Sequence, residues 1–360
     1  METKIYAFLI VAMVLTNVSV SMAKTVQVGG CLSGPQTYPT ISQAVVAVPS
    51  GSTILVCPGA YPEQVAITQP LTLRGVQSAN AGNSVITPPP GGLTKTVLTG
   101  GGLKIYYQLL ARGTISNAVN ISNIAVDGTN NAVPASSALV GVYYQNSSGT
   151  LSNAAIYNQT GTGAGFGVIL ENTNATPISV SVLGSAIHDF DQGGIQVGGN
   201  IASTIKSNEI NTSTGPSGIN LNTGGIVANN RVNTHLPPQG TSSGVGISVM
   251  SDASITNNTV EGFTVGIWPL GTNNTVNLNK VSLAEAAVVV SGSANTIQHN
   301  SFLHIIHGGE AIHFNCTGTA NVVTHNIIND SYWGIIDDDG TNVIIPNSYF
   351  NVTNLVSPPC

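Results

Sequence analysis

Three carboxylates of this chain have types and spacing that suit acid–base chemistry. Glu171 ends one apolar segment, and Asp189 and Asp191 lie in the turn that enters the next one. Two carboxyl groups held about 5–10 Å apart can act as acid and base on a glycosidic bond. The same oxygen atoms can hold Ca²⁺. If the protein is an enzyme, we expect Glu171, Asp189 and Asp191 to be catalytic, with Ca²⁺ as a possible cofactor and no dedicated metal site.

A second group of ionisable residues lies near the C-terminus. His307, Glu310 and His313 are followed one repeat later by three consecutive Asp residues at 337–339. Imidazole and carboxylate side chains in such a group can form an acid–base or a metal site. An Asp-Gly sequence is equally typical of a solvated turn, so both interpretations stay open.

Short repeated strands must position these groups. A small residue followed by alternating apolar and polar residues recurs about every 20–28 residues. It occurs at Gly141, Gly167, Gly194, Gly218, Gly246, Gly266, Ala287, Ala311 and Gly334. A second marker is an Asn before an apolar position, at Asn208, Asn230, Asn258, Asn279, Asn300, Asn326 and Asn347. Two markers in a fixed order predict a solenoid of about ten stacked coils, with an Asn at the same turn of each coil.

The N-terminal part of the chain carries a further pattern. An amphipathic stretch at 40–48 predicts a short helix, and β-rich segments follow it. The paired repeat markers resemble those of the pectin-lyase-like superfamily. Segments 38–51, 53–65 and 71–75 resemble the beginning of pectin methylesterases and of many bacterial β-helix proteins. The resemblance implies a right-handed parallel β-helix, in which the helix at 40–48 would cap the apolar end of the solenoid.

Alternation within each strand divides its residues between a buried and an exposed face. In the superfamily that the chain resembles, the outward residues of these strands and their flanking turns carry the sugar-binding groove. Amide, indole and imidazole side chains suit hydroxyl groups and sugar rings. The expected substrate-binding residues are Gln145, Gln196, Asn220, Asn222, Trp268 and His313. An ordinary solvated strand surface would have the same pattern, and this alternative stays open.

Most catalytic motifs of the superfamily are missing from the sequence. Residues 59–63, Gly-Ala-Tyr-Pro-Glu, match the Gly-x-Tyr-x-Glu element of pectin methylesterases, which we expect to be structural. The esterase elements Gln-Asp-Thr and Asp-Phe-Ile-Phe-Gly are absent, as are the polygalacturonase elements Gly-Asp-Asp, Gly-His-Gly and Arg-Ile-Lys. Pectate lyases use an Arg as base, and the outward positions hold none. No catalytic residue is carried over from the superfamily.

Composition and charge narrow the class of protein. Charged residues make up 7% of the chain, against about 25% in ordinary globular proteins. The net charge of −6 leaves no basic patch for nucleic acid. Residues 1–23 resemble a secretory signal peptide, and 24–360 are expected to form a single right-handed β-helix domain. No later run reaches the ~20 apolar residues of a membrane span.

The four cysteines predict two disulfides in an exported protein. Cys31 and Cys57 flank one short segment and are expected to pair, which leaves Cys316 for Cys360; free thiols are the alternative. The second pair requires the C-terminal tail to fold back. Two coils would otherwise separate these cysteines by about 9.6 Å, beyond the ~7 Å limit for bridged Cα atoms.

The sequence therefore predicts an all-β, right-handed parallel β-helix that is secreted, periplasmic or on the cell surface. We expect it to act as a monomer that binds an extracellular polysaccharide or surface glycan. The alternative is a polysaccharide lyase or glycoside hydrolase that acts on an acidic, pectin-like polysaccharide. A structural or adhesive role without a defined ligand is a further alternative. The fold alone does not choose among them.

Overall fold

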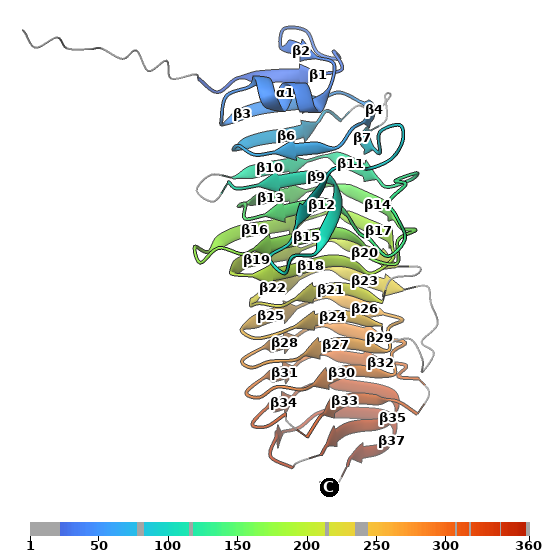
Figure 1. The fold of residues 1–360 in the computed structure, drawn as a ribbon. Helices are drawn as coiled ribbons and strands as arrows, with labels where there is room; N and C mark the ends of the chain where they lie inside the picture. Colours follow the sequence, from blue (N-terminus) through green and yellow to red (C-terminus); the bar gives the residue numbers. More distant parts are fainter. Residues whose placement is uncertain are drawn as a thin grey trace, which may run out of the picture.

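The chain folds into a parallel β-helix, in agreement with the repeat. In the computed structural model, each coil passes through three strands, and each strand pairs in parallel with its equivalent in the next coil. Figure 1 shows the coils stacked from the N-terminal end (blue) to the C-terminal end (red). The structure describes residues 22–77, 83–114, 118–212, 216–234, 244–306, 308–316, 318–338 and 340–357.

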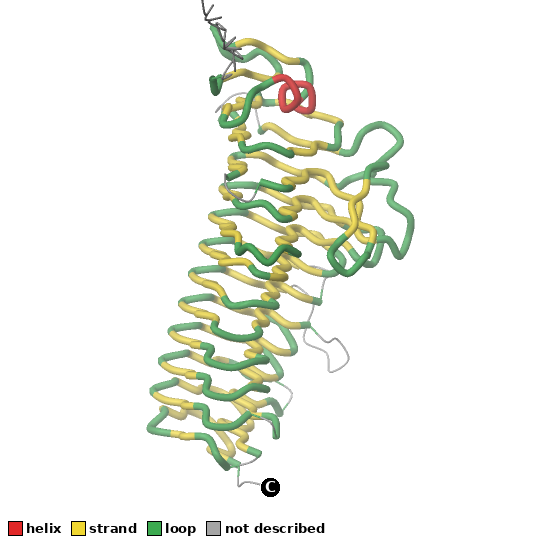
Figure 2. The backbone as a smooth tube through the Cα atoms, turned by 60° about the vertical axis from the view of Figure 1, so that its left-hand side comes forward, coloured by secondary structure: helices red, strands yellow, loops and turns green. Residues whose placement is uncertain are grey.

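The equivalent strands form three faces along the stack, which Figure 2 shows from a second direction. The first face is a 14-stranded sheet. Its strands, in stacking order, are β2 (Gln36–Tyr38), β1 (Thr25–Val28), β3 (Ser52–Val56), β6 (Leu71–Gly75), β10 (Val119–Ser122), β13 (Gly149–Ser152), β16 (Ile178–Leu183), β19 (Ile201–Lys206), β22 (Gly225–Ala228), β25 (Ala253–Thr256), β28 (Thr275–Asn277), β31 (Thr296–Gln298), β34 (Val322–Thr324) and β36 (Val343–Ile344).

The second and third faces are two rows of one 23-stranded sheet. The second face contains β4 (Gly59–Pro62), β7 (Ser84–Thr87), β11 (Ile124–Asp127), β14 (Ala155–Gln159), β17 (Ala186–Phe190), β20 (Glu209–Thr212), β23 (Arg231–Thr234), β26 (Thr259–Glu261), β29 (Lys280–Ser282) and β32 (Ser301–Leu303). The third face contains β5 (Val65–Ile67), β9 (Lys104–Arg112), β12 (Ala138–Gln145), β15 (Gly165–Asn172), β18 (Gly193–Gly199), β21 (Ser217–Leu221), β24 (Val245–Val249), β27 (Val265–Pro269), β30 (Ala286–Val290) and β33 (Glu310–Phe314). The long strands β35 (Ile327–Asp337) and β37 (Ser348–Val356) continue both faces.

Inward side chains of the three faces fill one continuous core. On the coil from β13 to β15, Leu151, Ile156 and Val168 are fully buried. Each lies opposite an apolar residue of the next coil, in the register pairs Leu151–Val182, Ile156–Ile187 and Val168–Ile195. Complete burial of such a side chain contributes about 1.5–3 kcal/mol, and the repetition of this arrangement in every coil holds the stack together.

The small residue of the first repeat marker is required where the third face begins. A Cβ atom at Gly218 would lie 2.3 Å from Val232 Cγ1 and 2.5 Å from the carbonyl oxygen of Gly246. Gly246 is equally close to the side chain of Val260. The neighbouring coil approaches so closely at Gly218 and Gly246 that a Cβ atom would require a shift of the coils. The equivalent position of β30 holds Ala287, the smallest residue with a Cβ atom.

The predicted Asn ladder is present at the turn from the first to the second face. Asn258 donates through Nδ2 to the Val227 carbonyl oxygen at 2.9 Å and to Asn279 Oδ1 at 2.9 Å. Equivalent bonds link Asn208, Asn230, Asn258, Asn279, Asn300, Asn326 and Asn347. The left-handed residue of this turn is the one before the ladder Asn, as at Leu278 with φ 57°. The ladder position therefore selects Asn for its amide rather than for its backbone.

A second ladder, which the sequence analysis missed, lies at the turn from the third to the first face. Asn274 accepts through Oδ1 from the Ala253 N–H at 2.9 Å, and its own N–H donates to Asn295 Oδ1 at 2.8 Å. Asn295 is bonded in the same way to Asn321, and Asn321 to Asn342. Two corners of the C-terminal coils are thus fixed by buried amides, each of which is satisfied.

The N-terminal coils contain the expected helix, α1 (Ile41–Ala47), with Ile41, Ala44 and Val45 buried. Glu63 accepts hydrogen bonds from the backbone N–H groups of Ile41 at 2.7 Å and Ser42 at 2.9 Å. A carboxylate is favourable at a helix N-terminus. The Gly-x-Tyr-x-Glu element is therefore structural here, as expected. Among the described residues there is no helix with the length and hydropathy of a membrane span.

One of the two predicted disulfides is present. Cys31 and Cys57 are bonded, with their Cα atoms 5.6 Å apart. Cys316 is an exposed free cysteine, so the structure does not contain the predicted bridge to Cys360, which lies outside the described residues. Within the described residues, β33, which precedes Cys316, is two strands away from β37. That separation is about 9.6 Å at the ordinary strand spacing.

Candidate functional site

The outward positions of the third face form one continuous row, as the alternation predicts. Gln196, Asn220, Ser248 and Trp268 are register partners on successive strands from β18 to β27. Val289 and His313 continue the row on β30 and β33. Gln196, Asn220, Trp268 and His313 are half-buried, and Asn222, at the end of β21, is exposed. We call the stretch from β18 to β33 the open half of the third face.

The other half of this face is covered by an insertion. Strand β8 (Thr96–Leu98) pairs antiparallel with the first residues of β9 to form a hairpin, residues 96–106. Figure 1 shows this hairpin in front of β12 and β15. Beneath it, Tyr143 is 0% exposed and Gln145 is 3% exposed. We call β9, β12 and β15 the covered half of the third face.

The predicted role of Gln145 in substrate binding is therefore wrong for this structure. Its Nε2 atom donates to the carbonyl oxygen of Leu98 in the hairpin at 2.6 Å. A side chain so bonded and so deeply buried cannot reach a polysaccharide. The outward direction of Gln145 was predicted correctly, but the covering segment turns an outward position into an interior one.

Glu171 secures the same hairpin and is not placed for catalysis. Its Oε1 atom accepts from the Gly100 N–H at 2.9 Å, and its Oε2 atom accepts from the Tyr143 hydroxyl and, at 3.3 Å, from Gln145 Nε2. Burial, together with the hydrogen bond to Glu171, raises the pKa of the Tyr143 hydroxyl, which stays protonated as a donor. A Cβ atom at Gly100 would lie 2.4 Å from Thr173 Cγ2, so the hairpin fits tightly here.

The predicted catalytic group of Glu171, Asp189 and Asp191 is not formed. Glu171 lies opposite Gly198, and Asp191 lies seven residues before Gly198. At about 3.3 Å per residue, Glu171 and Asp191 are on the order of 20 Å apart, too far to share one glycosidic bond. The prediction failed because one coil passes over all three faces, so neighbours in sequence lie on different sides of the stack.

The two aspartates have local partners instead. Asp191 Oδ2 accepts from the N–H groups of Thr162 at 3.0 Å and Gly163 at 2.8 Å, which fixes the turn of the preceding coil. Asp189 Oδ2 lies 2.7 Å from His188 Nδ1 on the second face. The His188 ring stacks on that of Tyr157, with the ring centres 5.2 Å apart. These contacts account for both carboxylates as parts of the scaffold.

The second predicted group is partly assembled, on the open half of the third face. His313 Nδ1 lies 2.7 Å from Glu310 Oε2, and His313 Nε2 lies 3.2 Å from Asp338 Oδ2. The hydrogen bond to Glu310 raises the pKa of His313, and Asp338 acts in the same direction against the opposing effect of burial. With a carboxylate at each ring nitrogen, the charged imidazolium can donate to both.

The other members of that group lie apart or are not described. Asp337 is 5% exposed and accepts from Asn342 Nδ2 at 2.6 Å, which makes it part of the core. His307 and Asp339 lie outside the described residues. Within the described part of the chain, no group of three or more His, Cys, Asp or Glu side chains has the geometry to hold a metal ion.

A cavity of about 550 Å³ lies beside His313. Among the residues that line it are Val265, Glu285, Val289, Glu310 and His313. We call it the Glu285 cavity. The Oε1 atom of Glu285 is buried and has no hydrogen-bond partner. The cavity therefore combines apolar side chains with the acidic residues Glu285 and Glu310 and the imidazole of His313, a mixture typical of a ligand site.

Sequence reasoning missed Glu285 because it followed strands and ignored turns. Glu285 lies in the turn just before β30, whereas Glu310 is the first residue of β33 and pairs with Ala286. An alignment of successive repeats would place Glu285 one residue away from the position of Glu310. That offset is the signal that could have found it.

Trp268 is held near the cavity by polar contacts. Its Nε1 atom donates to Ser291 Oγ at 2.9 Å, and Asn315 Nδ2 donates to the same oxygen at 2.8 Å. These bonds fix the indole across the coils from β27 to β33. An aromatic side chain with a fixed polar edge suits a ligand that has both apolar and hydroxylated surfaces.

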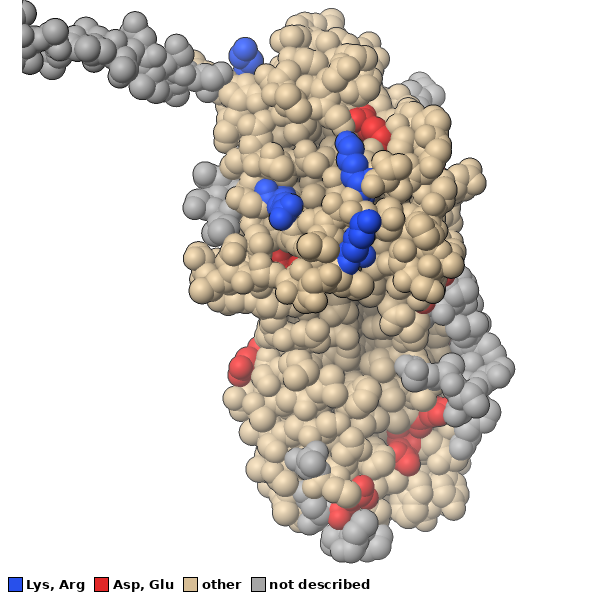
Figure 3. Space-filling model, in the orientation of Figure 1, with Lys and Arg blue, Asp and Glu red and all other residues tan. Residues whose placement is uncertain are grey.

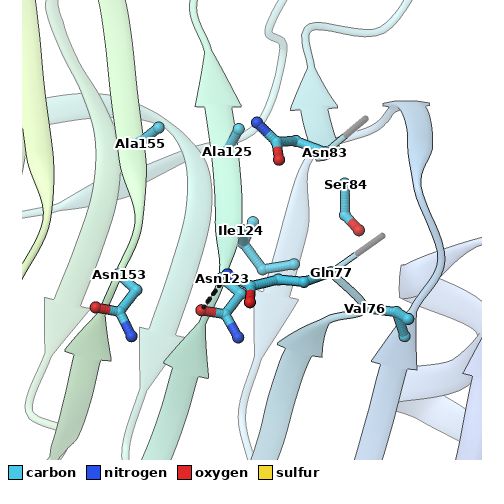
Figure 4. Close-up of a pocket in the computed structure, with 9 residues that line it drawn as sticks. All are labelled: Val76, Gln77, Asn83, Ser84, Asn123, Ile124, Ala125, Asn153 and Ala155. Carbon is cyan, nitrogen blue, oxygen red and sulfur yellow. Dashed lines mark hydrogen bonds between the residues drawn. The ribbon is translucent and has the colours of Figure 1, made fainter. Parts of the chain in front are cut away.

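A smaller cavity lies at the N-terminal end of the stack and carries no ionisable group. Figure 4 shows the amides of Gln77, Asn83, Asn123 and Asn153 around it. Gln77 Nε2 donates weakly to Asn123 Oδ1 at 3.5 Å. The volume of about 70 Å³ corresponds to roughly two water molecules. This cavity is too small for a sugar ring.

Charge is distributed unevenly along the stack. Residues 24–112 contain five Lys or Arg and one Glu, a balance of +4, whereas residues 245–338 contain one Lys and seven Asp or Glu, a balance of −6. In Figure 3 the basic residues of the visible face lie in its N-terminal part, and acidic residues predominate in its C-terminal part. The Glu285 cavity lies in the acidic part.

Comparison with known proteins identifies the fold. Neither a protein-family model nor a curated protein matches the chain. Among solved structures it is similar to the A-module of the mannuronan C-5 epimerase AlgE4 of Azotobacter vinelandii, with 13% identity, a TM-score of 0.58, and coverage of 88% of this chain and 90% of that one. A variant of the periplasmic alginate epimerase AlgG gives 13% identity, a TM-score of 0.53, and coverage of 89% and 84%.

A phage protein has the same architecture. The tailspike protein of E. coli bacteriophage HK620, solved in complex with a pentasaccharide, gives 12% identity, a TM-score of 0.57, and coverage of 86% of this chain and 59% of that one. The fold of the chain is therefore the right-handed parallel β-helix of pectate-lyase-like proteins, as the sequence resemblance implied. At 12–13% identity the likeness defines the fold and no activity.

Proposed function

We propose that this protein binds glycans along the open half of its third face. The observation that carries the proposal is the Glu285 cavity, which lies beside a continuous row of outward side chains that includes Asn220, Trp268 and His313. Amides and an imidazole bind hydroxyl groups, and an indole contacts the apolar face of a sugar ring. A row of such residues on a flat sheet suits an extended polymer better than a compact metabolite.

Three further facts support the proposal. Few charged side chains occur along the chain, so uncharged hydrogen bonding dominates its surface. The Cys31–Cys57 disulfide is typical of an oxidising compartment, which agrees with export of the chain to the periplasm, the cell surface or the medium. The structurally similar proteins include two alginate epimerases and a tailspike solved with a pentasaccharide.

A second candidate function is acid–base catalysis on a bound glycan. The specific observation in its favour is His313, which lies between Glu310 and Asp338 at the edge of the Glu285 cavity. Its raised pKa would favour a protonated imidazole near neutral pH, which could donate a proton to a leaving oxygen. A lyase or hydrolase would then use this group rather than Glu171, Asp189 and Asp191.

A polysaccharide panel distinguishes the two functions. We expect at least one neutral, amino or uronic-acid polysaccharide to bind, and we expect Trp268→Ala to weaken that binding about tenfold or more. Tyr157→Ala, an aromatic truncation on the second face, is the matched control and should bind like the unmodified protein. New reducing or unsaturated ends that disappear in His313→Ala would favour catalysis. Absence of binding and cleavage across the panel would contradict both functions.

A further inference from the structure

We infer that the glycan bound at the Glu285 cavity carries protonated amino groups, as deacetylated amino sugars do. This inference rests on the proposed function and specifies its ligand. The cavity contains Glu285 and Glu310, with Asp338 one contact away through His313. None of its described lining residues is Lys or Arg. Even with His313 protonated, three carboxylates and one imidazolium leave a net charge of about −2.

Glu285 lines the cavity, and one oxygen of its carboxylate has no donor within the protein. Its backbone is fixed, because the Glu285 N–H donates to the Thr264 carbonyl oxygen at 3.1 Å and its own carbonyl oxygen accepts from the Glu310 N–H at 2.9 Å. Its buried Oε1 atom has no donor. A buried carboxylate oxygen without a donor is unfavourable. An ammonium group supplies three N–H donors and the opposite charge, so it suits the Glu285 carboxylate at the cavity better than a neutral hydroxyl does.

The environment of Glu310 also favours a ligand that carries amino groups. One of its oxygens already accepts from His313 at 2.7 Å, and its side chain is still 29% exposed at the cavity. The register pair Ala286–Glu310 places Glu285 and Glu310 on adjacent coils, roughly one strand spacing of 4.8 Å apart along the stack. Two acceptors at this separation can bind one amino group or two on neighbouring sugar residues.

The charge of the surrounding coils favours cationic over acidic glycans. Residues 245–338 have a balance of −6, and acidic residues predominate in this part of the face in Figure 3. A uronic-acid polymer laid along the open half would meet like charge, whereas an amino-sugar polymer would be attracted to it. The acidic, pectin-like polysaccharide of the alternative lyase or hydrolase function therefore does not suit this site.

Calorimetry with three oligosaccharides of equal length tests the inference on the full chain. The probes are a glucosamine oligomer, its N-acetylated counterpart, and an oligogalacturonate with and without Ca²⁺. We expect the glucosamine oligomer to bind at least about tenfold more tightly than the other two, because only it forms charge-assisted hydrogen bonds. Its binding should weaken as salt is added.

Two variants locate the effect. Glu285→Gln keeps the size of the side chain and removes its charge, and we expect it to reduce the preference for the glucosamine oligomer to about threefold or less. Glu209→Gln is the matched control, because Glu209 is an exposed carboxylate on the second face whose Oε1 atom accepts from Asn211 Nδ2. It should leave the preference unchanged. Because both variants have the same net charge, a difference between them reflects the cavity.

Each outcome has a defined meaning. Equal or tighter binding of the acetylated oligomer, or Ca²⁺-dependent binding of the oligogalacturonate, overturns the inference but leaves glycan binding intact. No binding of any glycan on the panel overturns the proposed function as well. If Glu285→Gln fails to fold, the preference of the unmodified protein and its salt dependence still decide.

Discussion

The covered and the open halves of the third face are built from the same repeat but present different surfaces. Tyr143 in the covered half and Trp268 in the open half occupy the same outward row, connected by register pairs through five strand pairings from β12 to β27. Tyr143 is completely buried under the hairpin, whereas Trp268 is half-buried at the surface. Equivalent repeat positions thus form core in one half and accessible surface in the other.

The difference shows that an insertion, and not the repeat, decides which outward positions of this solenoid stay accessible. The hairpin adds a layer over β12 and β15, and the side chains beneath it form their own apolar cluster with Val97, Ile105 and Tyr107. No such layer among the described residues covers β27, β30 and β33. The charge balance changes in parallel, from +4 in the N-terminal coils to −6 in the C-terminal coils.

The largest expected difference between the two halves is in the free energy of unfolding after truncation of Tyr143 or Trp268, the aromatic residues of this row. Tyr143→Ala should reduce the free energy of unfolding by about 3–5 kcal/mol, because it removes a fully buried aromatic side chain. Trp268→Ala should reduce it by about 1 kcal/mol or less, as for a surface residue, while it weakens glycan binding. Urea denaturation measures the first quantity, with hydrogen exchange at β12 as a local check. Equal destabilisation by both variants would contradict the division into halves.

A smaller effect is expected from releasing the hairpin. Glu171→Ala removes the acceptor of the Gly100 N–H and the Tyr143 hydroxyl, which should cost about 1–3 kcal/mol and raise hydrogen exchange within residues 96–106. Glu209→Ala, which removes an exposed carboxylate from the second face, is the control and should change neither quantity. If the hairpin stays equally protected in Glu171→Ala, then Glu171 does not hold it and its role must be sought elsewhere.

The fold could be predicted because every coil repeats the same local requirements. Gly218 is small, and Asn258 carries an amide, because each lies in close contact with the next coil. The regular spacing of such residues in the sequence therefore predicts a stack of coils. The outward direction of Gln196, Asn220 and Trp268 follows from the same alternation. The hairpin could not be predicted in the same way, because its cover over Tyr143 depends on contacts between distant segments.

The candidate site was only partly predictable for a related reason. Glu171 and Asp191 are close in sequence, but the path of one coil around three faces separates them. Asp338 lies 25 residues after His313, farther than Asp191 lies from Glu171, and yet the stacking of β33 on β35 brings it to His313. In a solenoid, residues one full repeat apart are neighbours, whereas Asp191 falls seven residues short of Gly198, the residue one repeat after Glu171. Glu285 was missed because it lies outside the strands on which the markers depend.

The smallest expected effect is a pH-dependent change in melting temperature when His313, in the open half, is replaced. The folded state raises the pKa of His313 above its ordinary value of about 6.5. A raised pKa contributes stability that is fully present below the unfolded value and is lost as the pH rises through the folded value. His313→Gln should therefore reduce the melting temperature most at about pH 5–6.5 and progressively less at higher pH.

His188→Gln, which also removes a histidine that contacts a carboxylate, is the matched control for His313→Gln. His188 pairs with Asp189 on the second face at 2.7 Å and is 41% exposed, against 28% for His313, which has a carboxylate at each ring nitrogen. Solvent screens the more exposed pair more strongly, so His188→Gln should lower the melting temperature less than His313→Gln does at about pH 5–6.5. If His313→Gln lowers the melting temperature equally at every pH, the imidazolium is not held by Glu310 and Asp338. His313 would then not offset the charge of Glu285 and Glu310 at the cavity.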